Sequence, residues 1–218
     1  MRVVVAGGHG KIALLLERLL AERGDQAVGL IRNPAHAAEV QKTGAEAVVC
    51  DLEAASAADV AVLLSGADAV VFAAGAGAGS GVPRKDSVDR GASVLMADAA
   101  GRAGVRRFVQ ISSMGAGQPP QPGADEVWAA YITAKTAAED DLRSRDLDWT
   151  IVRPGRLTDA PPTGRIRLVA PPVPRGAVSR ADVAAAIAAL LDEPGTGHKT
   201  LELTGGDSPV AAAVRGIS

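Results

Sequence analysis

The stretch MRVVVAGGHGKIA, residues 1–13, decides the fold class, because a short apolar run leads directly into a glycine-rich turn. Residues 2–6 predict a buried β-strand, and apolar residues recur at helical spacing from Lys11 onward. In the spacing Gly7-x-x-Gly10-x-x-Ala13, the first glycine permits a tight turn, the second lets backbone approach a pyrophosphate, and the alanine keeps the helix close to the strand. The stretch therefore predicts a strand–turn–helix unit that binds a dinucleotide at the helix N-terminus.

The pair Gly10-Lys11 also resembles the end of a P-loop, the phosphate-binding turn of many nucleoside triphosphatases. In that motif Ser or Thr follows the lysine, and a glycine stands five positions before the second glycine. Here Ile12 follows the lysine and Val5 stands at the earlier position. We therefore reject the P-loop interpretation.

Apolar runs alternate with helical patterns along the rest of the chain. Strands are expected at 27–31, 47–50, 69–73, 107–112, 149–153 and 200–203, and helices at 11–23, 55–65, 88–103, 127–145 and 179–191. Continuous apolar strands separated by helices are typical of a parallel sheet covered on both faces, with right-handed crossovers. The sequence thus predicts an α/β fold, a Rossmann-type doubly wound parallel sheet with helices on both faces, in one domain over residues 1–218.

Two proline-rich segments, 119–122 and 154–174, are expected to form loops at one rim of the sheet. We expect a small substrate-side region built from residues 114–128 and 154–178. The chain after Pro154 is short, which disfavours a sugar-nucleotide epimerase with a large substrate domain.

Composition, net charge and cysteine count exclude several classes of binding site and partner. Hydrophobic residues make up 47% of the 218 residues but aromatic residues only 2%, so helices and sheet must pack through Ala, Val, Leu and Ile. The net charge of −2, with both signs interleaved, gives no basic stripe for nucleic acid or a membrane surface. The lone cysteine, Cys50, excludes an internal disulfide, and no His, Cys and carboxylate cluster has metal spacing. With no leader and no membrane-length apolar run, we expect a cytoplasmic protein, monomer or homodimer, that binds a small molecule.

The ends of the second and third strands bear on the choice of cofactor. An NAD-specific site usually carries an acid after the second strand to hold the ribose 2′-hydroxyl, whereas this chain has Arg32. An arginine fork can pair with a 2′-phosphate, so we expect NADP(H), with NAD(H) as the alternative; a solvated strand end is the other interpretation of Arg32. Asp51, followed by Leu52, could accept a hydrogen bond from the adenine amino group or serve as an ordinary turn residue.

Several short motifs follow the glycine turn in order. They are Asp51-Leu52, Ala73-Ala74-Gly75, FVQISS at 108–113, Tyr131-x-x-x-Lys135 and IVRPG at 151–155. In this order and spacing they resemble the short-chain dehydrogenase/reductase family, in its atypical NmrA-like and flavin-reductase-like branch, over nearly the whole chain. The resemblance implies an NAD(P)-dependent reductase or dehydrogenase. The residues expected to contact its cofactor are Gly7, His9, Gly10, Lys11, Ile12, Arg32, Asp51, Leu52, Ala73, Ala74, Gly75, Lys135, Pro154 and Gly155.

The expected catalytic residues are Ser113, Tyr131 and Lys135. Reducing a carbonyl by hydride requires a proton donor near the nascent alkoxide, and a tyrosine can serve if a nearby cation lowers its pKa. Tyr131 and Lys135 are four positions apart, which places them on one face of a helix. Ser113 could polarise the substrate oxygen; the resemblance favours it over Ser112, and both remain open.

The predicted function is an NADP(H)-dependent oxidoreductase that transfers hydride to or from a small carbonyl, quinone or flavin-like substrate. The alternative is a non-catalytic NADP(H)-binding redox sensor or regulatory protein, in which cofactor occupancy changes a partner surface without turnover.

Overall fold

Strand β1 (Arg2–Ala6) lies inside a nine-stranded sheet in the computed structural model, which describes residues 1–77, 79–120 and 123–217. The other strands of this sheet are β2 (Gln26–Ile31), β3 (Glu46–Val49), β4 (Ala69–Phe72), β5 (Arg107–Ile111), β6 (Asp148–Pro154), β8 (Arg165–Val169), β10 (Lys199–Gly205) and β11 (Ser208–Pro209). Their order is β11-β8-β10-β6-β5-β4-β1-β2-β3. Every predicted strand is present, with ends shifted by at most two residues.

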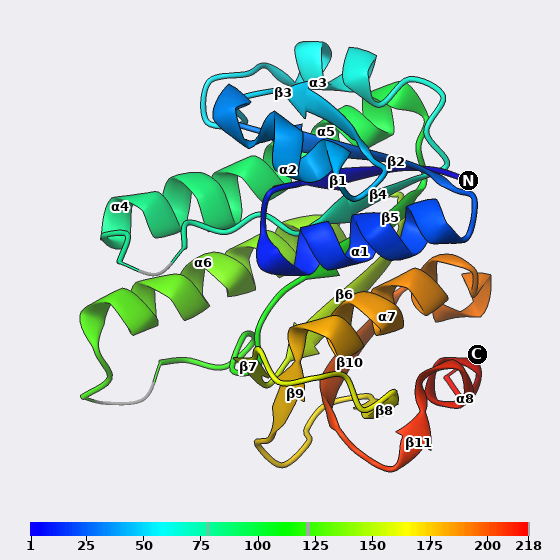
Figure 1. The fold of residues 1–218 in the computed structure, drawn as a ribbon. Coiled ribbons are helices and arrows are strands. Elements are labelled where there is room, and N and C mark those ends of the chain that lie inside the picture. Colours follow the sequence, from blue (N-terminus) through cyan, green and yellow to red (C-terminus); the bar gives the residue numbers. More distant parts are fainter. Residues whose placement is uncertain (78, 121–122, 218) are drawn as a thin grey trace.

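The helices alternate with these strands (Figure 1). They are α1 (Lys11–Glu22), α2 (Ala37–Gln41), α3 (Ala57–Leu63), α4 (Val82–Arg84), α5 (Ser93–Ala103), α6 (Glu126–Arg143), α7 (Arg180–Leu191) and α8 (Val210–Arg215), with 3₁₀ turns at Pro34–His36 and Pro194–Thr196. A π-helical segment, Lys85–Ala92, joins α4 to α5. The helix predicted at 88–103 therefore begins earlier, because Gly81 is extended and Pro83 fits a first helical turn.

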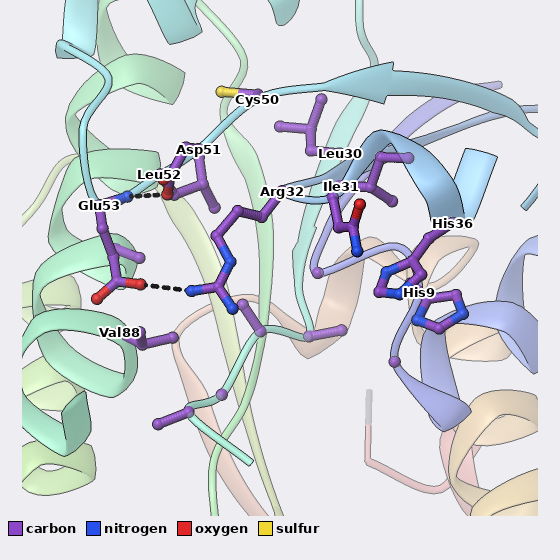
Figure 2. A pocket seen from close by; sticks show the side chains of 18 of the residues that line it. His9, Leu30, Ile31, Arg32, His36, Cys50, Asp51, Leu52, Glu53 and Val88 are labelled. Carbon is purple, nitrogen blue, oxygen red and sulfur yellow. Dashed lines mark hydrogen bonds and ion pairs between the residues drawn. The ribbon is translucent and has the colours of Figure 1, made fainter. Parts of the chain in front are cut away.

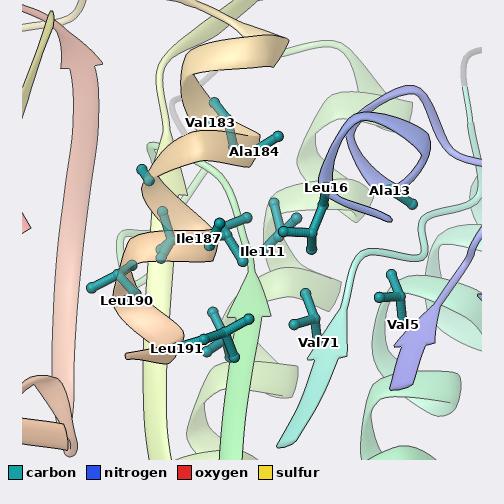
Figure 3. Packing of buried hydrophobic residues seen from close by; sticks show 14 of the residues in the cluster. Val5, Ala13, Leu16, Val71, Ile111, Val183, Ala184, Ile187, Leu190 and Leu191 are labelled. Carbon is teal, nitrogen blue, oxygen red and sulfur yellow. The ribbon is translucent and has the colours of Figure 1, made fainter. Parts of the chain in front are cut away.

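Side chains along β1 point alternately to the two faces of the sheet. Val3 and Val5 pack in a cluster with α1 and α7, whereas Val4 and Ala6 pack in a second cluster with α3 and α5. Figure 3 shows Leu16 and Ile187 of the first cluster packed among Val5, Val71 and Ile111. Helices thus cover both faces of a mostly parallel sheet, and the predicted single-domain α/β Rossmann-type fold is confirmed.

The prediction of loop throughout 154–174 is wrong. The segment contains β8, which runs antiparallel to β10, and β7 (Arg156–Thr158), which pairs in parallel with β9 (Ala177–Ser179) in a separate two-stranded sheet. In β8 Ile166 and Leu168 are buried while their neighbours are exposed, which is the two-residue alternation of a half-buried strand. Prolines before and after this short stretch make the alternation hard to recognise in the sequence. Residues 121–122 of the other expected loop lie outside the described residues.

The strand order reverses between β1 and β4. From β1 the chain continues to β2 and β3 on one side, and β4, β5 and β6 follow on the other. In open α/β sheets, ligands bind in the crevice at the carboxyl ends of the strands beside such a reversal. The glycine turn after β1 lies at this point.

Candidate functional site

The glycine turn has a conformation that requires glycine at its first position. Gly7 has φ +79°, and a Cβ there would lie 2.7 Å from the Ala74 Cα atom. The Gly10 amide donates a hydrogen bond to the Gly7 carbonyl oxygen at 2.8 Å. Gly10 also precedes α1 in an extended conformation with no side-chain cap, so the first amide groups of α1 remain suited to binding an anion.

A cleft of about 390 Å³ opens beside this turn, and we call it the Arg32 cleft (Figure 2). The predicted cofactor residues that line it are Gly7, His9, Gly10, Arg32, Asp51, Leu52, Ala73, Ala74 and Gly75. His9 stacks on His36 with ring centroids 3.6 Å apart, and its Nε2 atom lies 3.0 Å from the Glu39 carboxylate. His36, which the sequence did not single out, also lines the cleft.

Glu53 and Arg84 are residues of this cleft that sequence reasoning missed. The Glu53 carboxylate accepts hydrogen bonds from the Ser87 hydroxyl at 2.6 Å, Arg84 at 2.7 Å and Arg32 at 2.9 Å; Figure 2 shows the pair with Arg32. The Ser87 hydrogen bond, followed by the two arginines, holds the pKa of Glu53 below its usual range. No local pattern links these residues, because they come from three separate segments.

Asp51 has a local structural contact. Its carboxylate accepts a hydrogen bond from the Glu53 amide at 3.0 Å, as in an Asx turn. Asp51 therefore stabilises the turn that presents Glu53, and it also lines the Arg32 cleft.

A second cleft, of about 600 Å³, contains Lys135, and we call it the Lys135 cleft. It shares residues 73–75 with the Arg32 cleft, so the two are continuous at the end of β4. Lys135 is 3% exposed, and its ammonium lies 3.2 Å from both the Ile111 carbonyl oxygen and Asp89 Oδ1. Asp89 belongs to the π-helical segment, and its other carboxylate oxygen accepts a hydrogen bond from the Ala76 amide at 3.2 Å.

Tyr131 lies near two ammonium groups. The Lys85 ammonium is 5.3 Å from the centre of its ring and the Lys135 ammonium 5.8 Å. Both lysines line the Lys135 cleft with Tyr131, so the predicted pair of Tyr131 and Lys135 is brought together. Lys85, which donates to the Gly77 carbonyl oxygen at 3.0 Å, was not predicted.

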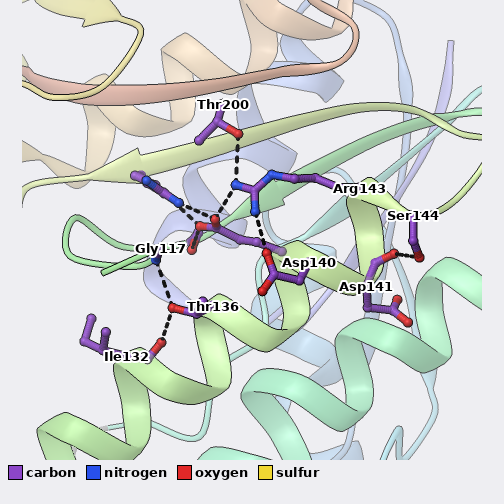
Figure 4. A network of polar contacts seen from close by, with 11 residues as sticks. Gly117, Ile132, Thr136, Asp140, Asp141, Arg143, Ser144 and Thr200 are labelled. Carbon is purple, nitrogen blue, oxygen red and sulfur yellow. Dashed lines mark hydrogen bonds and ion pairs between the residues drawn. The ribbon is translucent and has the colours of Figure 1, made fainter. Parts of the chain in front are cut away.

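The two candidate serines have different surroundings. The Ser112 hydroxyl is buried and donates to the Glu139 carboxylate at 2.6 Å. The same carboxylate pairs with Arg153 and Arg143, and Figure 4 shows how Arg143 reaches Thr200 as well. Ser113 is only half-buried, and among the described residues its hydroxyl has one long contact, of 3.3 Å, to the Met114 carbonyl oxygen.

A third pocket, of about 720 Å³, adjoins the Lys135 cleft, and we call it the arginine pocket. The predicted residues Ser113, Tyr131, Pro154 and Gly155 line it, together with Met114, Trp128, Arg156, Leu157, Arg175, Gly176, Ala177 and Arg180. Tyr131, Trp128 and Leu157 also line the Lys135 cleft, so a continuous groove runs from the Arg32 cleft to the arginine pocket. Of the remaining predicted residues, Ile12 lines the Lys135 cleft, and Lys11 pairs instead with Asp159 at 2.7 Å.

Glu17 of α1 lies directly under the glycine turn. Its side chain is fully buried, and its carboxyl oxygen would lie 2.8 Å from a Cβ placed on Gly8. Within the described part of the chain, neither carboxyl oxygen has a hydrogen-bond partner. Burial raises the pKa of Glu17 to about 8. The nearby Thr43 hydroxyl has a smaller, opposing effect on this pKa, and its own hydrogen bond goes to the Val40 carbonyl oxygen.

Over the described residues, no helix is long and apolar enough to cross a membrane. In that same part of the chain, no three or more His, Cys, Asp and Glu side chains are grouped so that they could hold a metal ion.

The fold and the glycine turn define a Rossmann-type nucleotide-binding protein. The chain belongs to an NAD(P)H-binding family, whose model matches residues 7–194. An uncharacterised sugar epimerase of Bacillus subtilis is 34% identical over 99% of this chain and 99% of its own length. Among the similar solved structures is the candidate NAD-dependent epimerase/dehydratase of Bacillus halodurans (TM-score 0.91, 34% identity, 99% of both chains). Another is an oxidoreductase of Lactococcus lactis (TM-score 0.86, 25% identity, 99% of this chain and 96% of that one).

The predicted nicotinamide-cofactor family is thereby confirmed. The family is described as NAD(P)H-binding, and the similar proteins named above are an oxidoreductase and epimerase-like proteins.

Proposed function

We propose that the protein is an NADP(H)-dependent reductase of the short-chain dehydrogenase/reductase type, acting on a small carbonyl, quinone or flavin-like compound. The observation that carries the proposal is the position of Tyr131, which lies near two lysine ammonium groups where the Lys135 cleft meets the arginine pocket. Ser113 lines the same pocket. The family's NAD(P)H binding and the similarity to a Lactococcus lactis oxidoreductase support the proposal.

The groove fits an elongated dinucleotide. A Cβ would fill the space beside Gly7, and the α1 amides have no side-chain cap, so Gly7, Gly10 and the first turn of α1 would hold the pyrophosphate. Arg32 and Arg84 would bind the adenosine end, and Lys135 with Pro154-Gly155 would bind the nicotinamide ribose end. Bound there, the reduced cofactor supplies the hydride.

The side chains around the reacting carbonyl have separate tasks. The Tyr131 hydroxyl donates a proton to the oxygen as hydride reaches the carbon, and the phenolate is reprotonated from solvent. Lys135 and Lys85 stabilise that phenolate electrostatically. The Ser113 hydroxyl donates to the same oxygen, because Ser112 is held by Glu139.

The proposed preference for NADP(H) rests on Arg32 and Arg84. Both guanidinium groups converge on Glu53, so both lie where they can exchange that carboxylate for a 2′-phosphate. The exchange replaces one charge-assisted set of hydrogen bonds by another, and the doubly charged phosphate attracts both guanidinium groups more strongly than a carboxylate does, so we expect a preference over NADH of roughly tenfold.

Calorimetric titration with NADPH and NADH tests this preference. We expect Arg32→Ala to weaken NADPH binding and leave NADH binding nearly unchanged, with Arg18→Ala, an exposed arginine of α1, as the control. Glu53→Gln removes a competing anion, so it should tighten NADPH binding. If Glu53→Gln instead weakened NADH binding and NADPH bound no better than NADH, Glu53 would be the partner of a 2′-hydroxyl and the NADP preference would be wrong.

Turnover tests the reductase itself. We expect net NADPH oxidation with one or more members of a panel of aldehydes, quinones and flavins, and its loss in Tyr131→Phe with NADPH affinity intact. Binding without turnover would favour the sensor. The uncharacterised sugar epimerase of Bacillus subtilis matches this chain over 99% of both lengths, so chain length does not argue against epimerase activity. Conversion of a substrate without net NADPH consumption would identify the protein as an epimerase.

A further inference from the structure

The arginine pocket carries positive charge that hydride transfer does not require. Among its described lining residues Arg156, Arg175 and Arg180 are basic and none is acidic. Arg180 pairs with Asp159 at 2.6 Å. Within the described residues, the guanidinium groups of Arg156 and Arg175 have no hydrogen-bond or ion-pair partner.

The backbone that carries these two arginines is well fixed. Arg156 begins β7 and pairs with Ala177 of β9, and its amide donates to the Gly176 carbonyl oxygen at 2.9 Å. A Cβ on Gly155 would clash with that same carbonyl oxygen, so the two segments touch, and Arg156 and Arg175 follow and precede the glycines at this contact in the lining of the pocket.

We propose that the substrate carries an acidic group, a carboxylate or a phosphate, which binds Arg156 and Arg175 while its reducible group lies at Tyr131 and Ser113. The proposal rests on the proposed function, since Tyr131 and Ser113 line the same pocket. Both exposed guanidinium groups line one pocket, so an oxyanion bound there would balance their charge and accept hydrogen bonds from both. Trp128, 44% exposed beside them, offers an apolar face to the body of the substrate.

Equilibrium binding tests the charge preference without requiring turnover. Benzoate, phenyl phosphate and the neutral benzamide are titrated calorimetrically into protein saturated with NADP⁺. We expect at least one anion to bind about tenfold more tightly than benzamide, and the tighter anion identifies the acidic group. The preference should disappear in Arg156→Gln/Arg175→Gln, with benzamide binding unchanged, and persist in Arg167→Gln, an exposed arginine of β8 outside the pocket.

Added salt gives a second measurement on the unaltered protein. Anion affinity should fall with rising sodium chloride while benzamide affinity stays constant, because salt screens exposed charges. Equal affinity for the anions and benzamide, no detectable anion binding at millimolar concentration, or a preference that survives the double substitution would each overturn the proposal.

Turnover separates this inference from the proposed function. With NADPH, 4-carboxybenzaldehyde should be reduced with a higher kcat/KM than its neutral methyl ester. If neither compound nor the wider panel is reduced but anions still bind selectively, the reductase assignment fails and the anion site remains. If the ester is reduced as efficiently as the acid and anions bind no better than benzamide, the reductase stands and the anion site fails.

Discussion

Replacing Glu17 by glutamine should stabilise the protein in a strongly pH-dependent way. The carboxyl group is buried under the glycine turn without a hydrogen-bond partner in the described residues, and its pKa is about 8 against an ordinary value of 4.5. Below about pH 4.5 the group is protonated in both folded and unfolded states, and it costs no stability through ionisation. Between 4.5 and about 8 the unfolded chain loses the proton and the folded chain keeps it, so stability falls as pH rises.

The size of the effect follows from this difference. One pKa unit corresponds to about 1.4 kcal/mol, so the shift gives a ceiling of about 5 kcal/mol, reached above pH 8. Glutamine has nearly the shape of the neutral acid and cannot ionise. The Glu17→Gln protein should therefore match the wild type in acid and exceed its free energy of unfolding by at least about 2 kcal/mol in mild alkali.

Urea denaturation at a series of pH values between 4.5 and 9 measures the difference. Glu22→Gln, in the exposed last turn of the same helix, removes the same formal charge and serves as the control. A difference between wild type and Glu17→Gln that stays constant across this pH range would refute the reasoning, as would an equal response of the control.

Three further substitutions test the turn, the polar network and the core. Gly7→Ala should weaken NADPH binding in calorimetry by at least tenfold, because its Cβ would lie 2.7 Å from the Ala74 Cα at φ +79°; unchanged affinity would show that the turn does not hold the cofactor. Glu139→Ala leaves Arg153 buried and unpaired, so urea denaturation should show a loss of about 3–5 kcal/mol, and a loss below about 1 kcal/mol would contradict this. Leu16→Ala should cost about 2–5 kcal/mol in the same assay, and a smaller loss would mean that the first cluster collapses around the cavity.

The central strands could be predicted because their burial is continuous. Strands such as β1 and β4 are covered on both faces, so each appears as an uninterrupted apolar run with the right length. Strand β8, which lies between β10 and the two-residue strand β11, has only one buried face, and nearby prolines obscured its alternating pattern. The start of α4 was missed for a related reason, since it follows a glycine-rich stretch that resembles a loop.

For the site, the sequence predicted residues that belong to local motifs. Tyr131 and Lys135 lie on one helix, and the glycine turn is contiguous, so spacing alone brought each set together. Glu53 and Asp89 could not be predicted, because their partners lie on other elements and only the packed fold brings them within hydrogen-bond distance. A pattern in one segment carries no information about such pairings.

The scarcity of aromatic residues gives this protein a built-in optical reporter. Its two tryptophans differ sharply, since Trp149 of β6 is 8% exposed and packs in the second cluster, whereas Trp128 is 44% exposed and lines the arginine pocket. Replacing Trp149 by phenylalanine would leave Trp128 as the sole indole. Because Trp128 lines the arginine pocket, its fluorescence would then respond to a ligand bound there. The lifetime and wavelength of that emission would then follow each ligand as it enters, with no label attached to the chain.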